Sequence, residues 1–196
     1  MICLTCHVIT PGPVCDECAA GIRPTPERVL PGGLRVVAPF EHVGTARRLM
    51  HLMKYRGVTG YAALVAELLS DRLPPAPLVP VPRSLSRRLR YGVDPSLVIA
   101  QALSARSGAP VLRCLWPPLH TRRRAGGDHF RQPGRFRVRR PPGVGVILLD
   151  DVVTTGATLL AAERALGSEN VLCAAAANSV AGVSSLSGLV QTEGRD

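Results

Sequence analysis

The chain has 196 residues, of which 46% are apolar, and it carries a formal net charge of +10. This length allows one domain with a small appendage, and the apolar content is sufficient for a buried core. No apolar run approaches the ~20 residues that a helix needs to span a bilayer, and the N-terminus lacks the features of a signal peptide. We therefore expect a cytoplasmic globular protein without membrane insertion.

Four of the six cysteines lie near the N-terminus, as Cys3-x2-Cys6 and Cys15-x2-Cys18. Two such pairs separated by a short turn are typical of a structural zinc site with four thiolate ligands. A segment this short cannot build a stable core without a disulfide or a bound metal. The reducing compartment that we expect disfavours disulfides. Surface thiols or disulfides are the alternative, and His7 could replace one thiolate.

Apolar periodicity predicts alternating strands and helices further along the chain. We expect strands at 34–40, 78–81, 111–115, 136–138, 146–149 and 171–177. We expect helices at 45–54, 61–73, 95–106 and 158–166. Asp94 is the expected N-cap of the third helix, with Pro95 at its first position. This alternation predicts an α/β fold with a doubly wound parallel sheet.

These expectations divide the chain into four parts. A zinc-binding knuckle or ribbon occupies residues 1–23, and a linker rich in proline and glycine follows at 24–33. The α/β domain extends over 34–180. Residues 181–196 form a C-terminal tail, because they are rich in serine and glycine.

Residues 146–158 read Val-Ile-Leu-Leu-Asp-Asp-Val-Val-Thr-Thr-Gly-Ala-Thr. Four apolar residues indicate a buried parallel strand, and Asp150 and Asp151 follow at its carboxyl end, where open α/β sheets bind ligands. The loop 154–158 offers backbone N–H groups, hydroxyls and a helix N-terminus, all of which suit a phosphate. The alternative is an ordinary strand–turn–helix unit in which one threonine caps the helix.

The positive charge is concentrated in residues 83–140. This block holds 14 arginines and two acids, a balance of +12, which leaves −2 for the rest of the chain. Arginine makes bidentate contacts with phosphates, so the block indicates a pyrophosphate substrate, a nucleic acid, or both. A solubilising face is the alternative. Few aromatic residues are available for stacking on bases, which favours contacts to a nucleic-acid backbone or to a protein.

The 146–158 stretch resembles the phosphoribosyl pyrophosphate (PRPP) signature of type I phosphoribosyltransferases. The order of the other motifs resembles the ComF competence-protein family, including its GntX-type members. That family joins a four-cysteine zinc element to a phosphoribosyltransferase-like domain. Besides the cysteines, the shared elements are Met53-Lys54-Tyr55-Arg56-Gly57, Pro80-Val81-Pro82, the arginines at 122–124 and Phe136-Arg137-Val138. The family's Arg-Gly-Phe-Asn-Gln motif is replaced by Tyr91-Gly92-Val93-Asp94-Pro95.

The resemblance implies a type I phosphoribosyltransferase-like protein that binds PRPP or a nucleoside monophosphate with Mg²⁺. Phosphoribosyl transfer to or from a nucleobase is the implied activity. Asp150 and Asp151 would take the ribose hydroxyls, directly or through Mg²⁺ and water. The phosphate-binding residues would be Val152, Thr154, Thr155, Gly156, Ala157 and Thr158. The pyrophosphate loop would comprise Pro82, Arg83 and Ser84. Lys54 and Arg56 are candidates for closing over the leaving group, with a solvated helix end as the alternative for Lys54.

The same family implies an alternative function, that of a non-catalytic adapter in DNA uptake. Its PRPP pocket would then sense a ligand, while the zinc element and the arginine block would engage single-stranded nucleic acid or a DNA-uptake helicase. The sequence alone leaves both functions and the oligomeric state open.

Overall fold

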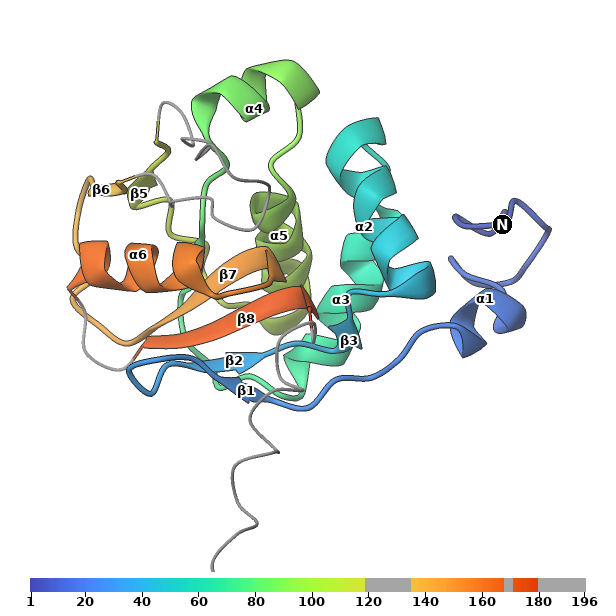
Figure 1. Ribbon diagram of the computed structural model, residues 1–196, viewed down its shortest axis with the longest axis horizontal. Helices are drawn as coiled ribbons and strands as arrows, with labels where there is room; N and C mark the ends of the chain where they lie inside the picture. The colour runs from blue at the N-terminus through green and yellow to red at the C-terminus, as the bar shows by residue number, and fades with distance from the viewer. Residues whose placement is uncertain (119–134, 168–170, 180–196) are drawn as a thin grey trace, which may run out of the picture.

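The computed structural model describes residues 1–118, 135–167 and 171–179. Its centre is a six-stranded sheet in the order β1-β2-β8-β7-β4, with β3 also paired with β8 (Figure 1). The strands of this sheet are β1 (Arg28–Val29), β2 (Arg35–Val37), β3 (Phe40–Glu41), β4 (Leu78–Pro80), β7 (Val146–Val153) and β8 (Val171–Asn178). A separate antiparallel pair consists of β5 (Leu115–Trp116) and β6 (Arg137–Val138). The helices are α1 (Asp16–Ala20), α2 (Gly44–Arg56), α3 (Gly60–Ser70), α4 (Leu85–Tyr91), α5 (Pro95–Ser107) and α6 (Ala157–Leu166).

Every strand pair of the central sheet is parallel except β1 with β2. The pairing of β7 with β8 extends from Val146 opposite Val171 to Val153 opposite Asn178. A short turn suffices between the antiparallel strands β1 and β2, whereas parallel neighbours need a longer crossover connection. The predicted fold class, α/β with a mostly parallel sheet, is therefore confirmed.

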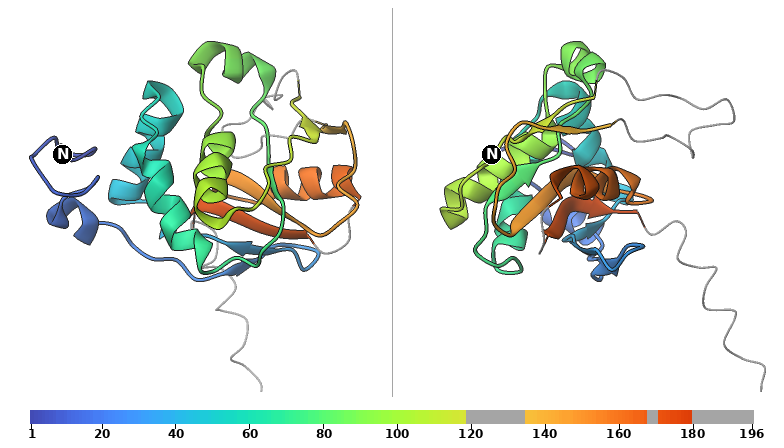
Figure 2. Two further views of the ribbon diagram at one scale, coloured as in Figure 1. Left: turned by 180° about the vertical axis from the view of Figure 1, so that it is seen from behind. Right: turned by 90° about the vertical axis from the view of Figure 1, so that its left-hand side faces the viewer.

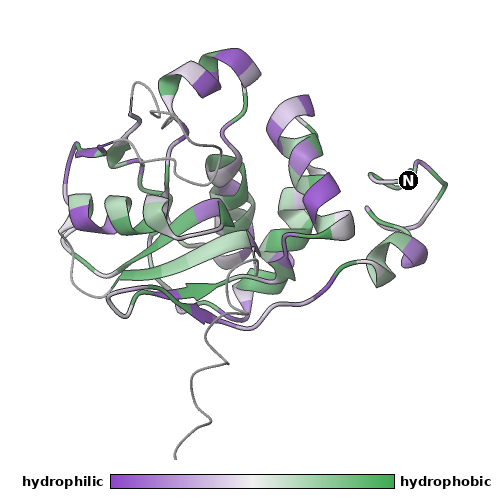
Figure 3. Cartoon of the chain, in the orientation of Figure 1, coloured by the Kyte–Doolittle hydropathy of each residue, from purple (hydrophilic) through white to green (hydrophobic). Residues whose placement is uncertain are grey.

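Helices cover both faces of this sheet (Figures 1 and 2). Ile147 and Leu149 of β7 belong to the core cluster that contains the buried side chains of α2, α3 and α5. Val146 and Leu148 belong to a second cluster, which contains the buried side chains of α6. Both sets of alternating side chains are thus buried, which explains why this run is apolar at every position. Figure 3 shows hydrophobic colours along β8 and most of β7, with a hydrophilic stretch near the end of β7.

The N-terminal element packs against the main core. An antiparallel bridge joins Ile2 to Ile9, and α1 follows after a turn. The helix α1 itself buries no side chain. Leu4, Val14 and Ile22 nevertheless pack, partly buried, against the α2–α3–α5 cluster. This small element therefore contacts the sheet domain directly.

The expected linker at 24–33 is partly sheet. It contains β1, and the N–H of Leu30 donates to the carbonyl of Leu34 at 2.8 Å to close the turn between β1 and β2. Leu30 is only 2% exposed and belongs to the α6 cluster. The prolines and glycines of this segment therefore belong to a hairpin. The sequence did not predict this hairpin, because one buried leucine gives too weak a periodic pattern.

Other boundaries also differ from the expectation. The expected strand at 34–40 is divided, because β2 pairs with the middle of β8 and β3 pairs with its end. The helix α4 was not predicted, since it buries no residue and so leaves no apolar periodicity. The strand expected at 111–115 is reduced to one bridge between Val111 and Leu78, followed by β5.

Two sequence predictions fall on residues that the structure does not describe: the arginines at 122–124 and the tail at 181–196. Within the described part of the chain, no helix combines the length and the apolar character needed to cross a membrane.

Candidate functional site

Two carboxylates lie near the carboxyl end of β7. Asp150 and Asp151 belong to the strand rather than following it, because the pairing with β8 continues to Val153. The strand is thus four residues longer than predicted. The two carboxylates are close enough that the charge of Asp151 acts on Asp150. Both are half-buried.

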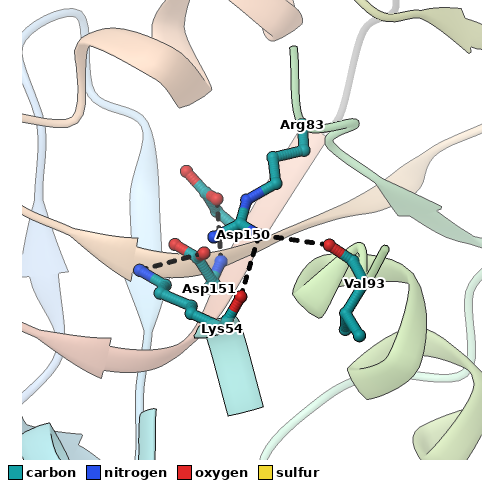
Figure 4. A network of polar contacts seen from close by, with 5 residues as sticks. All are labelled: Lys54, Arg83, Val93, Asp150 and Asp151. Atoms are coloured by element: carbon teal, nitrogen blue, oxygen red, sulfur yellow. Dashed lines mark hydrogen bonds and ion pairs between the residues drawn. The ribbon is translucent and has the colours of Figure 1, made fainter. Parts of the chain in front are cut away.

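Lys54 reaches this pair from the last turn of α2. Its Nζ lies 3.0 Å from Asp151 Oδ2, and the two side chains are only 16% and 18% exposed (Figure 4). Partial burial shields this ion pair from solvent and salt more than a surface pair. The alternative for Lys54, a solvated helix end, is therefore wrong.

Arg83 connects the loop after β4 to the end of α2. Its Nη1 donates to the carbonyls of Lys54 and Val93, at 3.1 and 3.2 Å (Figure 4). Its guanidinium also lies over the rings of Tyr55 and Tyr91, 5.8 and 5.2 Å from their centroids. Carbonyls in the last turn of a helix lack partners within the helix, and Arg83 supplies one. In this structure its side chain therefore holds the end of α2 in place.

The environment of Asp150 raises its pKa to about 7, chiefly through burial, with the charge of Asp151 acting in the same direction. The backbone N–H of Asp151 donates to Asp150 Oδ1 at 2.7 Å, which partly opposes this effect. A carboxyl group that titrates near neutral pH is typical of functional sites, although structural networks produce similar shifts.

Gly156 shapes the loop between β7 and α6. Its φ is +77°, and an added Cβ would lie 2.5 Å from both Cδ atoms of Leu30. It is the N-cap of α6 and provides no side-chain cap. Instead, Thr155 Oγ1 accepts a hydrogen bond from the N–H of Ala157 at 3.3 Å. The alternative, in which one threonine of an ordinary strand–turn–helix unit caps the helix, therefore explains Thr155 but no other polar group of the loop.

Arg28 of β1 steadies this loop, because its Nη1 donates to the carbonyl of Thr154 and to Asn178 Oδ1. Among the described residues, none bonds to the hydroxyl of Thr154 or Thr158. The first N–H groups of a helix also lack partners within the helix. The loop therefore presents several donors at one end of α6. Arg28 was missed because it lies in the expected linker.

The other predicted site residues do not all lie together. Ser84 is buried and is the N-cap of α4, with its Oγ 3.4 Å from Ser86 Oγ. Pro82 is half-buried beside it. Arg56 is exposed at the end of α2 and makes no hydrogen bond or ion pair within the described residues. Pro82, Arg83 and Ser84 thus form the connection from β4 to α4, whereas Arg56 lies apart.

His42, directly after β3, was missed by the sequence analysis. Burial lowers its pKa to about 4, and the positive charges of Lys54 and Arg47 act in the same direction. Its Nδ1 is buried and has no partner among the described residues. The imidazole is therefore neutral at physiological pH. A histidine after a two-residue strand leaves no sequence pattern that could have revealed it.

The four N-terminal cysteines form a second candidate site. Their Sγ atoms all lie within 4.8 Å of one another, with Cys3 buried, Cys6 exposed, and Cys15 and Cys18 half-buried. Tetrahedral zinc with Zn–S bonds of ~2.3 Å requires S···S distances of about 3.8 Å, which this cluster can reach with small adjustments. All four are free thiols. His7 is exposed and lies outside the cluster.

Backbone N–H groups, that of Cys6 first, lower the pKa of Cys3 to about 5. The N–H groups of Thr5 and Cys15 contribute, each 3.4 Å from Cys3 Sγ. Burial and the neighbouring sulfurs raise the pKa of Cys18 to about 12. Four thiols this close cannot all ionise without a cation between them, so the donor set fits a divalent metal such as zinc.

Comparisons with known proteins assign no family. Neither a family model nor a curated protein sequence matches the chain. Among solved structures, the chain is similar to UMP synthase of Leishmania donovani, with a TM-score of 0.34 and 20% sequence identity. The match covers 79% of this chain but only 27% of that chain. We draw no functional conclusion from a likeness at this level.

We expect purified protein to contain about one zinc ion per chain, as a closed four-ligand site requires. Cys3→Ser should lose the metal, because Cys3 is the ligand held by the most backbone N–H groups. Elemental analysis of both proteins measures this. Cys114→Ala is the control and should keep its zinc, since Cys114 lies in β-sheet packing away from the cluster. Folded, metal-free protein with disulfide-linked N-terminal cysteines would contradict the assignment.

Asp150→Asn should stabilise the protein at pH 8. The pKa of Asp150 is raised above that of an unfolded chain, so the folded protein keeps a proton that the unfolded chain releases. Stability is therefore lost as pH rises from about 4 to about 7. The asparagine cannot titrate, so its advantage over the parent should shrink towards pH 4. Thermal unfolding measures this difference: each kcal/mol gained in the free energy of unfolding should raise Tm by about 2–4 °C. The exposed Asp71→Asn is the control; equal effects of both substitutions at pH 8 would refute the account.

Gly156→Ala should destabilise the protein for two reasons. A positive φ costs an alanine about 1–2 kcal/mol, and the new Cβ would collide with Leu30. Gly167→Ala at the other end of α6 is a matched control, because its φ is +57° and nothing lies within 4 Å of an added Cβ. Urea unfolding should show a larger loss for Gly156→Ala. If both variants lose the same free energy of unfolding, the close approach of Gly156 to Leu30 does not contribute to stability.

Proposed function

We propose that this protein is phosphoribosyltransferase-like and binds PRPP or a nucleoside monophosphate together with Mg²⁺. The observation that carries the proposal is the junction of β7 and α6. There, two half-buried carboxylates are followed, after Val152 and Val153, by a loop whose hydroxyls and N–H groups have few partners among the described residues. Such a junction at the carboxyl edge of a parallel sheet suits a sugar phosphate.

The two halves of the junction would bind different parts of the ligand. Carboxylates repel phosphate, so Asp150 and Asp151 would face the ribose hydroxyls. The 5-phosphate would lie on the loop 154–158, at the positive end of the α6 dipole. The wall opposite would be the connection from β4 to α4, where the pyrophosphate of PRPP would lie near Arg83.

The residues present fit Mg²⁺. Asp150 Oδ2 and Asp151 Oδ1 make no hydrogen bond or ion pair to any described residue, since the contacts of this pair use the other oxygens. Mg²⁺ is typically held by one or two carboxylates together with substrate phosphates. When bound, the ion would neutralise charge that develops on the leaving pyrophosphate.

In phosphoribosyl transfer the bond between C1 of ribose and the pyrophosphate oxygen breaks, and its electron pair leaves with pyrophosphate. A nitrogen of the acceptor base bonds to C1 and loses its proton. The protein then contributes mainly position and electrostatics. Asp150 and Asp151 would orient the ribose. Lys54 is paired with Asp151 in this structure and would turn towards the leaving group.

The second candidate is the adapter that binds single-stranded nucleic acid or a DNA-uptake helicase. The arginine block with its balance of +12 favours it. The densest part of that block, residues 122–124, lies outside the described residues. Release of pyrophosphate from PRPP on addition of a nucleobase would favour the enzyme, and PRPP binding without such release would favour the adapter.

Calorimetric titration with PRPP and Mg²⁺ tests the proposed site. Asp150→Asn combined with Asp151→Asn should weaken binding about 100-fold or more, since charged hydrogen bonds of about 1.5–3 kcal/mol each are lost. Asp71→Asn combined with Glu163→Gln removes the same charge elsewhere and should bind like the parent. Undiminished binding by the first double variant would refute the site.

A further inference from the structure

A cavity of about 370 Å³ lies beside the proposed pyrophosphate loop. Its walls come from the end of β4, from α4, from the start of α5 and from β5. Pro80, Leu85, Leu97 and Leu115 give it an apolar surface. Cavities of this size with largely apolar walls and a few polar groups are typical of small-molecule sites.

Three arginines surround this cavity. Arg88 comes from α4, Arg113 precedes β5, and Arg139 follows β6. All three are exposed, and within the described ranges their guanidinium groups make no hydrogen bond or ion pair. Three segments of the basic block, far apart in sequence, thus converge on one apolar hollow. Unpaired guanidinium groups in this arrangement suit a phosphate group.

Asp94 lines the same cavity, and one of its carboxylate oxygens is unsatisfied. It is the N-cap of α5, yet its side chain makes no capping hydrogen bond. Its Oδ2 instead accepts a hydrogen bond from the N–H of Arg83 at 3.4 Å, and its Oδ1 is buried without a partner among the described residues. A buried acceptor left without a donor is costly. This oxygen therefore calls for a donor from a ligand.

We propose that this cavity, here called the arginine pocket, binds a nucleoside monophosphate as a second ligand. The phosphate lies on Arg88, Arg113 and Arg139, the base lies on the apolar wall, and a base N–H donates to Asp94 Oδ1. The combination selects this class, because a sugar phosphate has no flat apolar face and a nucleoside has no anion for the arginines.

The arginine pocket is distinct from the junction of β7 and α6, because none of its lining residues belongs to either element. It shares Pro82 with the proposed pyrophosphate loop, and Asp94 is bonded to the next residue, Arg83. A ligand in the pocket therefore contacts the loop that faces the first site. Nucleotide binding in the arginine pocket does not require PRPP binding at the junction of β7 and α6, so the two can be tested separately.

The single tryptophan of the chain allows a local measurement. Trp116 lines the pocket and is 55% exposed. The protein is titrated with AMP, GMP, CMP and UMP, and tryptophan fluorescence is excited at the red edge, beyond nucleotide absorption. At least one nucleotide should change the signal with saturation, and the matching nucleoside should not. Calorimetry in the Asp150→Asn, Asp151→Asn background gives the affinity with the first site disabled.

Arg113→Gln and Arg139→Gln should each weaken this binding at least about tenfold, as expected for loss of a charge-assisted contact. Asp94→Asn should also weaken it, because the amide oxygen stays on the N–H of Arg83 and the amide nitrogen then faces the ligand. Arg137→Gln is the matched control: it is exposed, lies two residues from Arg139 and does not line the pocket.

Several results would overturn the proposal. One is that no mononucleotide changes the tryptophan signal. Another is equal binding by the parent, Arg113→Gln and Arg139→Gln. If the Asp150→Asn, Asp151→Asn double variant loses nucleotide binding while the pocket variants keep it, the nucleotide binds at the first site. Tighter binding of a single-stranded oligonucleotide than of every mononucleotide would identify the arginines as part of a nucleic-acid surface.

Discussion

The pairing of β7 with β8 fixes the backbone of the two carboxylates and the start of the loop at the candidate site. β7 is buried on both faces from Val146 to Leu149, and the same register continues through two carboxylates to Val153. Because the strand does not end before the acids, the sheet holds their backbone rigidly. The loop at Gly156 then starts from a defined point. A flexible connection at this place could not hold carboxylates and loop donors in one arrangement.

Holding acids in a sheet has an electrostatic cost that the surroundings offset only in part. Lys54 compensates Asp151, whereas Asp150 is left with a pKa of about 7. Replacing such a group with a neutral one commonly stabilises a protein while removing its function. The single lysine of the chain is therefore already paired with Asp151, and the proposed ligand would have to compete with Asp151 for it.

Arg83 illustrates how a basic residue that the sequence predicts to bind phosphate can have a structural task. Its side chain completes the end of α2 and lies beside two tyrosine rings that contact each other, while its backbone N–H bonds to Asp94. The loop after β4 is thereby tied to α2 on one side and to the start of α5 on the other. This restrained segment lines the arginine pocket through Pro82, and through Arg83 it contacts Lys54, the partner of Asp151.

Sequence reasoning predicted the parts of this protein that rest on strong local patterns. Burial on both faces made β7 and β8 recognisable, and Cys-x2-Cys spacing revealed the cysteine cluster, which the structure brings together. What it missed depends on contacts between distant residues. Arg28 is 126 residues from the Thr154 carbonyl that it binds, and α4 has no buried face to produce a periodic pattern. Asp94 was expected as a capping residue, and only its contacts show that it turns away from the helix.

The arginine block shows why net charge alone is a poor guide to a partner. A uniform basic surface would point its guanidinium groups to solvent and bind any polyanion through counterion release. In this fold the block is divided: Arg83 is directed inward to carbonyls and aromatic rings, and three others surround an apolar cavity. Charge that converges on a cavity whose carboxylate keeps one unpaired oxygen selects a ligand by shape and by hydrogen bonding as well as by charge. For this reason we propose a small phosphorylated ligand, rather than a polyanion, for the three arginines at the cavity.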